Sequence, residues 1–85
     1  MAENLGSRLR VIHLFDAYGT LLTFRQQRLM RFYYHDDLSL GEIAARLRIT
    51  RQAVYDGLRR AIGELSRLER HLGIVRRQRS LLFQC

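Results

Sequence analysis

LSLGEIAARLRITRQAVYDGLRR, residues 38–60, is the stretch that decides the fold of this 85-residue chain. Ser39 and Glu42 have the spacing of a capping box, in which two side chains bond each other's backbone N–H groups and start a helix. Thr50 predicts the start of a second helix, and Ala53 stands where that helix would carry the reciprocal acid. Because a helix N-terminus attracts anions, the missing acid slightly favours an approach to phosphate.

The apolar residues of this stretch have the spacing that lets two short helices pack across a turn. They are Ile43, Ala44, Leu47, Ile49, Val54 and Leu58. The small side chain of Ala44 allows the helices to cross closely, as a helix-turn-helix requires. Arg48 lies in the turn, where glycine would adopt the required backbone conformation at lower cost. We therefore expect an all-α fold, a small helical bundle that contains a helix-turn-helix and an extended C-terminal helix.

Motifs along most of the chain resemble a known family and occur in the same order. They are FDxYG at residues 15–19, LLT at 21–23, Gln26, YYxDDLSLGEIA at 33–44 and RQAVYD at 51–56. The helix-turn-helix resembles the promoter-reading C-terminal region of sigma factors. The whole set is more similar to the small YlxM-type family, which is associated with the signal recognition particle. Two positions depart from that pattern. Arg48 lies where such turns usually have glycine, and Gly57 replaces a larger residue in the second motif helix.

The resemblance implies a role with the signal recognition particle, whose core is a GTPase protein bound to a small RNA. The major groove of A-form RNA is too narrow for helix insertion. Binding to such an RNA would therefore depend on the backbone and the shape, and the motif would be a DNA reader put to a new use.

Length and charge narrow the classes of function. A chain of 85 residues is one small domain, and 47% hydrophobic residues without proline fits a helical globular protein. The net charge of +7 predicts an acidic partner, most simply nucleic acid. Over residues 39–60 five arginines oppose two acidic residues, so much of the basic excess lies on the helix-turn-helix.

The chain divides into three parts by composition. Residues 1–6 are expected to be a flexible N-terminus, residues 7–75 a single helix-turn-helix domain, and residues 76–85 a basic C-terminal tail. The tail carries three arginines and no acid, and the apolar residues 81–83 follow them. It is a frayed end, a docking peptide or a short membrane-surface helix, and we favour the frayed end.

A first helix is expected over about residues 7–18, with Gly19 as its stop. Its apolar stripe is predicted to include Leu9, and a hydrogen bond from Tyr18 is expected to fix the end of the same helix. These expectations follow from helical spacing alone.

A second helix begins at Thr23, which forms a capping box with Gln26. Phe24 follows in the first turn, where it either covers an edge of the core or marks a contact surface, and we favour the former. Tyr33 is expected on the apolar side of this helix. Because adjacent helical residues point about 100° apart, at most one of Tyr33 and Tyr34 should face a partner.

The last helix continues beyond the helix-turn-helix along a heptad-like seam. The seam consists of Val54, Leu58, Ala61, Leu65, Leu68, Leu72 and Val75. Gly57 and Gly63 each cost roughly 1 kcal/mol in a helix interior, so packing must hold this helix. The first half of the seam is expected to pack within the domain. The second half is left open between the same chain and a partner, which includes a homodimer.

Residues near the start of the second motif helix are the candidates for nucleic-acid binding. Thr50 and either Arg46 or Arg48 are expected to contact phosphate. Arg51, Gln52 and Tyr55 are candidates for base edges, with arginine preferring guanine and glutamine preferring adenine. The full set is Arg46, Arg48, Thr50, Arg51, Gln52, Tyr55, Arg59 and Arg60. Asp56 does not fit a phosphate-binding surface, because its carboxylate repels phosphate. It could instead accept a hydrogen bond from cytosine or pair with Arg59 or Arg60.

The sequence offers no set of residues for catalysis, a cofactor or a metal. The three histidines are far apart, the glycines form no phosphate-binding loop, and Cys85 is the single cysteine. We therefore expect no enzyme, no cofactor and no metal site. Without a signal peptide or an apolar run of spanning length, a cytoplasmic location is expected.

Two functions from different classes remain open. One is an accessory or regulatory protein that binds the RNA or the GTPase of the signal recognition particle. The other is a transcription regulator that binds double-stranded DNA.

Overall fold

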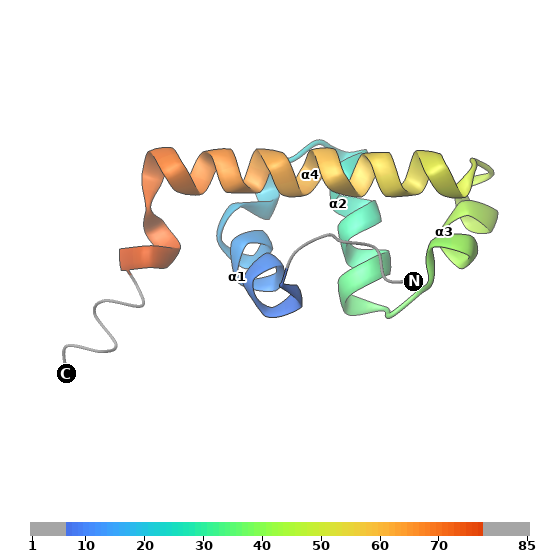
Figure 1. Cartoon of the computed structure of the whole chain (residues 1–85), viewed down its shortest axis with the longest axis horizontal. Helices are drawn as coiled ribbons and strands as arrows, with labels where there is room; N and C mark the ends of the chain where they lie inside the picture. Colours follow the sequence, from blue (N-terminus) through green and yellow to red (C-terminus); the bar gives the residue numbers. More distant parts are fainter. Residues whose placement is uncertain (1–6, 78–85) are drawn as a thin grey trace.

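The computed structural model describes residues 7–77 as a small all-α bundle (Figure 1). Its α-helices are α1 (Arg8–Tyr18), α2 (Phe24–Met30), α3 (Leu40–Leu47) and α4 (Arg51–Leu72). A 3-10 turn, η1 (Gly19–Leu21), follows α1, and a π-helical turn, η2 (Arg31–His35), extends α2. No strand occurs within residues 7–77, so the expected fold class is confirmed for this part. The predicted flexible N-terminus at 1–6 and residues 78–85 of the predicted tail lie outside the described residues.

The long helix α4 is the element on which the bundle is built. It runs along the long axis of the molecule, and α1, α2 and α3 lie along one side of it (Figure 1). Its inward face consists of Val54, Leu58, Ala61 and Leu65, all completely buried. The prediction that the first half of the seam packs within the domain is therefore confirmed. In the second half Leu68 is half-buried and Leu72 is 41% exposed.

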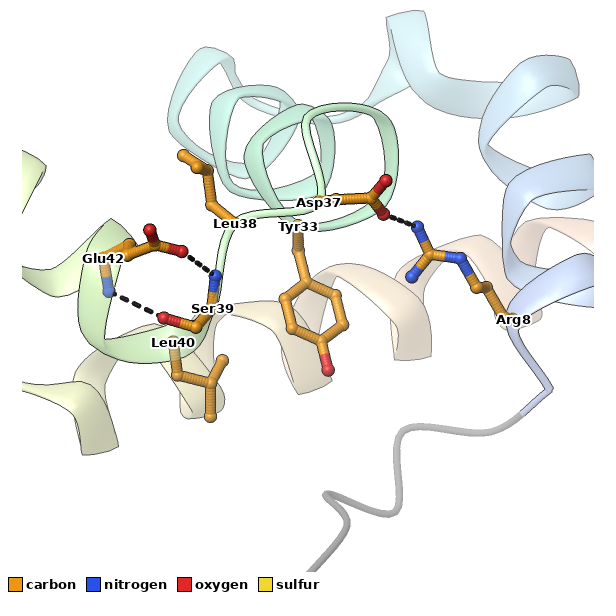
Figure 2. Close-up of a pocket in the computed structure, with 7 residues that line it drawn as sticks. All are labelled: Arg8, Tyr33, Asp37, Leu38, Ser39, Leu40 and Glu42. Atoms are coloured by element: carbon orange, nitrogen blue, oxygen red, sulfur yellow. Dashed lines mark hydrogen bonds and ion pairs between the residues drawn. The ribbon is translucent and has the colours of Figure 1, made fainter.

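The predicted helix starts are confirmed by their hydrogen bonds. Glu42 N–H donates to Ser39 Oγ at 3.1 Å, and Ser39 N–H donates to Glu42 Oε1 at 2.8 Å (Figure 2). Thr23 and Gln26 form the same reciprocal pair. These bonds satisfy N–H groups that the first helical turn leaves without a partner, and so they fix where α2 and α3 begin.

The two glycines of α4 have different surroundings. A Cβ built on Gly57 would lie 2.6 Å from Leu29 Cδ1, so the missing side chain lets α2 approach α4 closely. A Cβ on Gly63 would meet no atom within 4 Å. Close packing explains the first departure from helix propensity, whereas nothing in the structure explains the second.

The end of α4 is fastened to α1 through two buried polar side chains. The Tyr18 hydroxyl donates to Glu69 Oε1 at 2.6 Å and accepts from Ile74 N–H at 2.9 Å. Glu69 also accepts from the N–H groups of Val75 and Arg76. The expectation that Tyr18 fixes the end of its own helix is therefore wrong, because its partner lies on α4. No pattern in the sequence predicts that Glu69 is a buried acid that contacts α1.

Gly73 makes the turn that this arrangement needs. It ends α4 in the left-handed conformation, with φ 65° and ψ 25°, and donates its N–H to Glu69 O. The chain then turns back, and Val75 is buried against the core. Gly73 therefore separates α4 from the residues that follow it.

Two expectations about individual side chains, Leu9 and Phe24, are wrong. Leu9 is 64% exposed, because the inward face of α1 is formed by Val11, Leu14, Phe15 and Tyr18 instead. Phe24 is 86% exposed and covers no edge of the core. Tyr33 is half-buried and packs against the core, as expected, and Tyr34 is the fully buried residue of the pair. The π turn explains why Tyr34 is also buried, since one extra residue per turn shifts the inward position by one along the chain.

Candidate nucleic-acid interface

The turn between α3 and α4 has the strained backbone that the sequence predicts. Arg48 adopts the left-handed conformation, with φ 59° and ψ 45°. Such a conformation costs a residue with a Cβ on the order of 1 kcal/mol. The N–H groups of Arg48 and Ile49 both donate to Ala44 O, which closes the end of α3. The side chain of Arg48 is exposed at the outside of the turn.

The N-terminus of α4 is exposed and carries no acid in its first turn. Thr50 Oγ1 accepts from Ala53 N–H at 3.0 Å, which satisfies one N–H of that turn. The N–H groups of Arg51 and Gln52 have no intrahelical acceptor by position, and both residues are exposed. With the helix dipole, these groups make the tip of α4 suited to an anion such as phosphate.

Arg51 extends from this tip across the first turn of α3. A Cβ built on Gly41 would lie 3.2 Å from Arg51 Nε and 3.4 Å from its Nη2. The guanidinium therefore lies over Gly41 and places a positive charge where both helices of the motif meet. The role of Gly41 cannot be predicted from the sequence, because it depends on a contact between the two helices.

The next residues of α4 contact one another. Gln52 Nε2 donates to Asp56 Oδ1 at 3.0 Å, so the partner of Asp56 is Gln52 and not a neighbouring arginine. Reading adenine requires the donor and the acceptor of a glutamine amide, and one donor hydrogen of Gln52 is already used. Arg59 Cζ lies 5.9 Å from the centroid of the Tyr55 ring, which is half-buried. These contacts leave Arg51 as the most available base or phosphate donor at the tip.

Of the eight candidates, Arg46 lies on α3, and Tyr55, Arg59 and Arg60 lie beyond the first turn of α4. Arg46 Cζ is 5.7 Å from the centroid of the Phe32 ring, and Arg28 Cζ is 5.9 Å from the same centroid. Arg46 therefore groups with α2 and η2. Arg60 points about 100° around the α4 axis from Arg59. The structure thus brings Thr50, Arg51 and Gln52 together at the tip.

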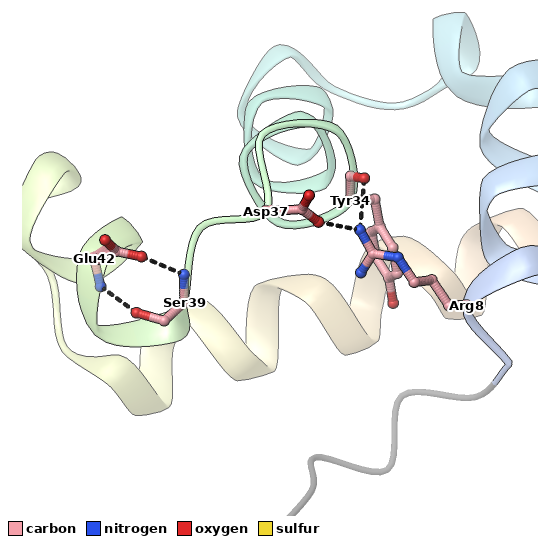
Figure 3. Close-up of polar contacts among 5 residues, drawn as sticks. All are labelled: Arg8, Tyr34, Asp37, Ser39 and Glu42. Carbon is pink, nitrogen blue, oxygen red and sulfur yellow. Dashed lines mark hydrogen bonds and ion pairs between the residues drawn. The ribbon is translucent and has the colours of Figure 1, made fainter.

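A hollow of about 330 Å³ lies beside the start of α3 (Figure 2). Its lining residues are Arg8, Tyr33, Asp37, Leu38, Ser39, Leu40 and Glu42. Arg8 donates to Asp37 Oδ1 at 2.5 Å and to Tyr34 O at 2.8 Å, and Ser39 and Glu42 bond each other (Figure 3). The charged groups of the hollow are used within the fold. Their arrangement fixes α1 against the entrance to the helix-turn-helix.

Tyr34 supports the same junction from inside. Burial raises the pKa of its hydroxyl to about 12, although the nearby Arg8 acts in the opposite direction. The phenol therefore stays neutral at any physiological pH, and the Arg8 guanidinium lies 5.3 Å from its ring centroid. This is a structural cation–π contact.

The described residues contain no group of three or more His, Cys, Asp or Glu side chains placed to hold a metal ion. Across residues 7–77 no helix combines the length and the apolar character needed to cross a bilayer.

The family model described as "Putative helix-turn-helix protein, YlxM / p13 like" matches residues 5–83. The chain belongs to this UPF0122 family. It is 47% identical over 81 residues to the UPF0122 protein of Shouchella clausii, a match that covers 92% of this chain and 74% of the relative. It is 55% identical over 60 residues to that of Desulforamulus reducens, covering 71% and 51%.

The UPF0122 protein of Listeria innocua is 47% identical over 72 residues, covering 82% of this chain and 66% of the relative. This chain thus spans between about half and three quarters of the length of these three relatives. The family resemblance seen in the sequence is confirmed.

Proposed function

We propose that this UPF0122 chain is a nucleic-acid-binding accessory or regulatory protein of the signal recognition particle pathway. The exposed, acid-free N-terminus of α4, with Arg51 lying across Gly41, is the observation that carries nucleic-acid binding. The link to the particle depends on the resemblance to YlxM-type proteins. The partner is then the RNA of the particle, alone or with its GTPase, and the site of action is the cytoplasm.

The proposed contact surface has two parts. At the tip of α4, Thr50 and Arg51 contact phosphates together with Arg48 from the turn. Gln52, Tyr55, Arg59 and Arg60 follow along α4, and Arg46 contributes from α3. Internal contacts of Gln52 and Tyr55 favour recognition of backbone and shape over direct base reading. Such recognition suits an A-form RNA helix, whose major groove does not admit an α-helix.

A transcription regulator that binds double-stranded DNA is the second candidate. The geometry of α3 and α4 favours it, because a helix-turn-helix places its second helix in the DNA major groove. A regulator of this kind binds as a dimer to two half-sites one helical turn apart. The exposed end of the α4 seam at Leu72 is the proposed dimer contact.

Competition at physiological ionic strength separates these functions. The competitors are the RNA of the particle, an unrelated structured RNA and duplex DNA from the gene's own promoter. A basic protein binds any polyanion non-specifically at low salt, and this binding falls steeply as the salt concentration rises. Affinity for one competitor alone therefore does not identify the ligand. We expect a preference for the particle RNA, or for its complex with the GTPase. Sequence-selective binding to promoter DNA that survives excess RNA would reject this function in favour of the regulator.

Two substitutions that each remove one positive charge form a matched pair. Arg51→Ala removes a guanidinium at the tip, whereas Arg70→Ala removes an exposed one in the last turn of α4. Arg51→Ala should weaken RNA binding and reduce the slope of log affinity against log salt by about 1. Arg70→Ala should change neither. Equal effects of both would mean that net charge alone drives binding.

A further inference from the structure

A basic and aromatic surface lies on α2 and the end of α3, and it exposes an aromatic ring that the core does not use. Phe24, Arg25, Arg28 and Leu47 line a hollow of about 280 Å³. Phe24 is 86% exposed, more than any other large apolar side chain of residues 7–77. An aromatic ring left in water forgoes the free energy that its burial would contribute. We call these four residues the α2 patch.

The α2 patch is strongly positive. Residues 20–35 contain three arginines and no acid. Within residues 7–77 the ion pairs are Arg8–Asp37 and Arg67–Glu64, so no carboxylate pairs with Arg25 or Arg28. A ligand that fills the hollow should therefore carry negative charge beside a flat or apolar group.

The α2 patch is continuous with the proposed nucleic-acid interface. Arg28 of the patch and Arg46 of α3 both approach the ring of Phe32, at 5.9 and 5.7 Å. Leu47, the last residue of α3, lies in the hollow and directly precedes Arg48 of the turn. One polyanion can therefore contact the turn and the patch at once.

We propose that Phe24 stacks on an unpaired nucleobase while Arg25 and Arg28 bind the phosphates on either side of it. This inference depends on the proposed nucleic-acid binding and adds that the ligand displays an unpaired base next to a paired stem. Aromatic rings beside arginines are a general means of holding unpaired bases. A hollow of this size is at the lower end for ligand sites and suits a single ring.

An acidic peptide with an apolar anchor fits the hollow less well. Such an anchor is held by apolar walls on most sides. Here only Phe24 and Leu47 are apolar, and the remaining walls are the two arginines. A base needs one open ring face and nearby cations, which is what the α2 patch provides.

The chain contains no tryptophan, so Phe24→Trp installs a unique fluorescent reporter at the patch. Leu9→Trp is the matched control, since Leu9 is a 64% exposed apolar residue on α1. The probes are a short RNA hairpin with one bulged nucleotide, the same hairpin fully paired, and the two DNA counterparts. Fluorescence anisotropy of labelled probes measures binding independently of the tryptophan signal.

The bulged RNA should quench the tryptophan of Phe24→Trp, and the paired hairpin should not. Neither probe should quench Leu9→Trp. Phe24→Ala should bind the bulged RNA about 5- to 30-fold more weakly, as loss of one stacked base predicts, with unchanged affinity for the paired hairpin. Phe24→Leu should behave like Phe24→Ala, because a leucine keeps the apolar contact but offers no ring. Equal quenching by bulged DNA would support stacking and would mean that the site does not distinguish ribose from deoxyribose.

Several results would overturn the proposal. If anisotropy shows binding but Phe24→Trp is not quenched, the stacking site is wrong and the proposed function stands. If no RNA or DNA probe binds at any concentration tested, both fail. A spectral shift caused by an acidic peptide with a leucine anchor, without any caused by bulged RNA, would assign the α2 patch to a protein partner.

Discussion

The Tyr18 hydroxyl donates a 2.6 Å hydrogen bond to the Glu69 carboxylate, and this contact joins residues 51 positions apart in the chain. It lies in the core at the junction of α1, α4 and the turn that follows Gly73. The carboxylate also holds the N–H groups of Val75 and Arg76. One buried acid therefore organises the C-terminal end of the domain.

Removing either partner should release the turn after α4 while the helix-turn-helix stays folded. Tyr18→Phe leaves a buried carboxylate with one donor fewer, which is costly in an apolar environment. We expect a lower urea midpoint and faster amide hydrogen exchange at Ile74, Val75 and Arg76. Glu64→Gln, which breaks an exposed pair with Arg67, is the control and should change little. Unchanged exchange in Tyr18→Phe would show that the contact does not hold the turn.

The same carboxylate should give the protein an acid-sensitive component of stability. Burial alone would raise the pKa of Glu69, but hydrogen bonds from Tyr18 and from the backbone N–H groups of Arg76 and Val75 outweigh it and hold that pKa below the ordinary 4.5. A carboxyl group whose pKa is lower in the folded state than in the unfolded state stabilises the folded protein above pH 4.5. This stabilisation is lost as the pH falls through the pKa of the folded state.

The measurement is the difference in urea midpoint between the native chain and Glu69→Gln, followed from neutral pH into the acid range. The difference should be largest near neutrality and should shrink below pH 4.5. A difference that stays constant over this range would mean that ionisation of Glu69 contributes nothing.

The core of the helix-turn-helix should depend more on Ile43 than on Leu47. Ile43 is completely buried, so Ile43→Ala should lower the free energy of unfolding by about 2–5 kcal/mol. Leu47 is only half-buried, so Leu47→Ala should cost less, about 1–2 kcal/mol. Chemical denaturation checks both values. The reverse order would place Leu47 at the centre of the packing.

The two glycines of α4 should respond oppositely to the same substitution. Gly63→Ala enters open space in an exposed helix interior and should raise the free energy of unfolding by about 0.5–1 kcal/mol. Gly57→Ala gains the same helix propensity, but its Cβ would lie 2.6 Å from Leu29 Cδ1, so the buried leucine must move. We expect it to be neutral or destabilising. Thermal unfolding of the two variants side by side provides the comparison, and equal stabilisation would contradict the close crossing of α2 and α4.

The end of the α4 seam provides a test of self-association. Because Leu72 is 41% exposed, Leu72→Asp should leave the domain folded. If two copies bury this leucine between them, the aspartate introduces an unpaired charge into the contact and the dimer should dissociate. Sedimentation velocity with circular dichroism measures both effects. An identical oligomer before and after the change would rule out this contact, and global unfolding would place Leu72 in the core.

The sequence by itself determined the helix starts and the turn of the motif. Thr23, Ser39 and Thr50 cap helices through hydrogen bonds to residues three positions on, and the structure contains all three. Arg48, the residue after α3, must be left-handed because only Ile49 and Thr50 separate it from the start of α4 at Arg51. Such features depend on groups that the chain itself keeps close, so no knowledge of the fold is needed to expect them.

Only the tertiary structure decided which side chains meet across the bundle. Burial of Glu69 and the approach of Leu29 to Gly57 depend on how α1 and α2 cross α4. The grouping of Arg46 with Arg28 and the exposure of Phe24 depend on the same packing. Helical spacing gives the direction of each side chain around its own axis, whereas contact requires the relative position of two axes. That position results from the sum of many packing contacts. The π turn adds to the difficulty, because it shifts the inward-facing position by one residue and so buries Tyr34.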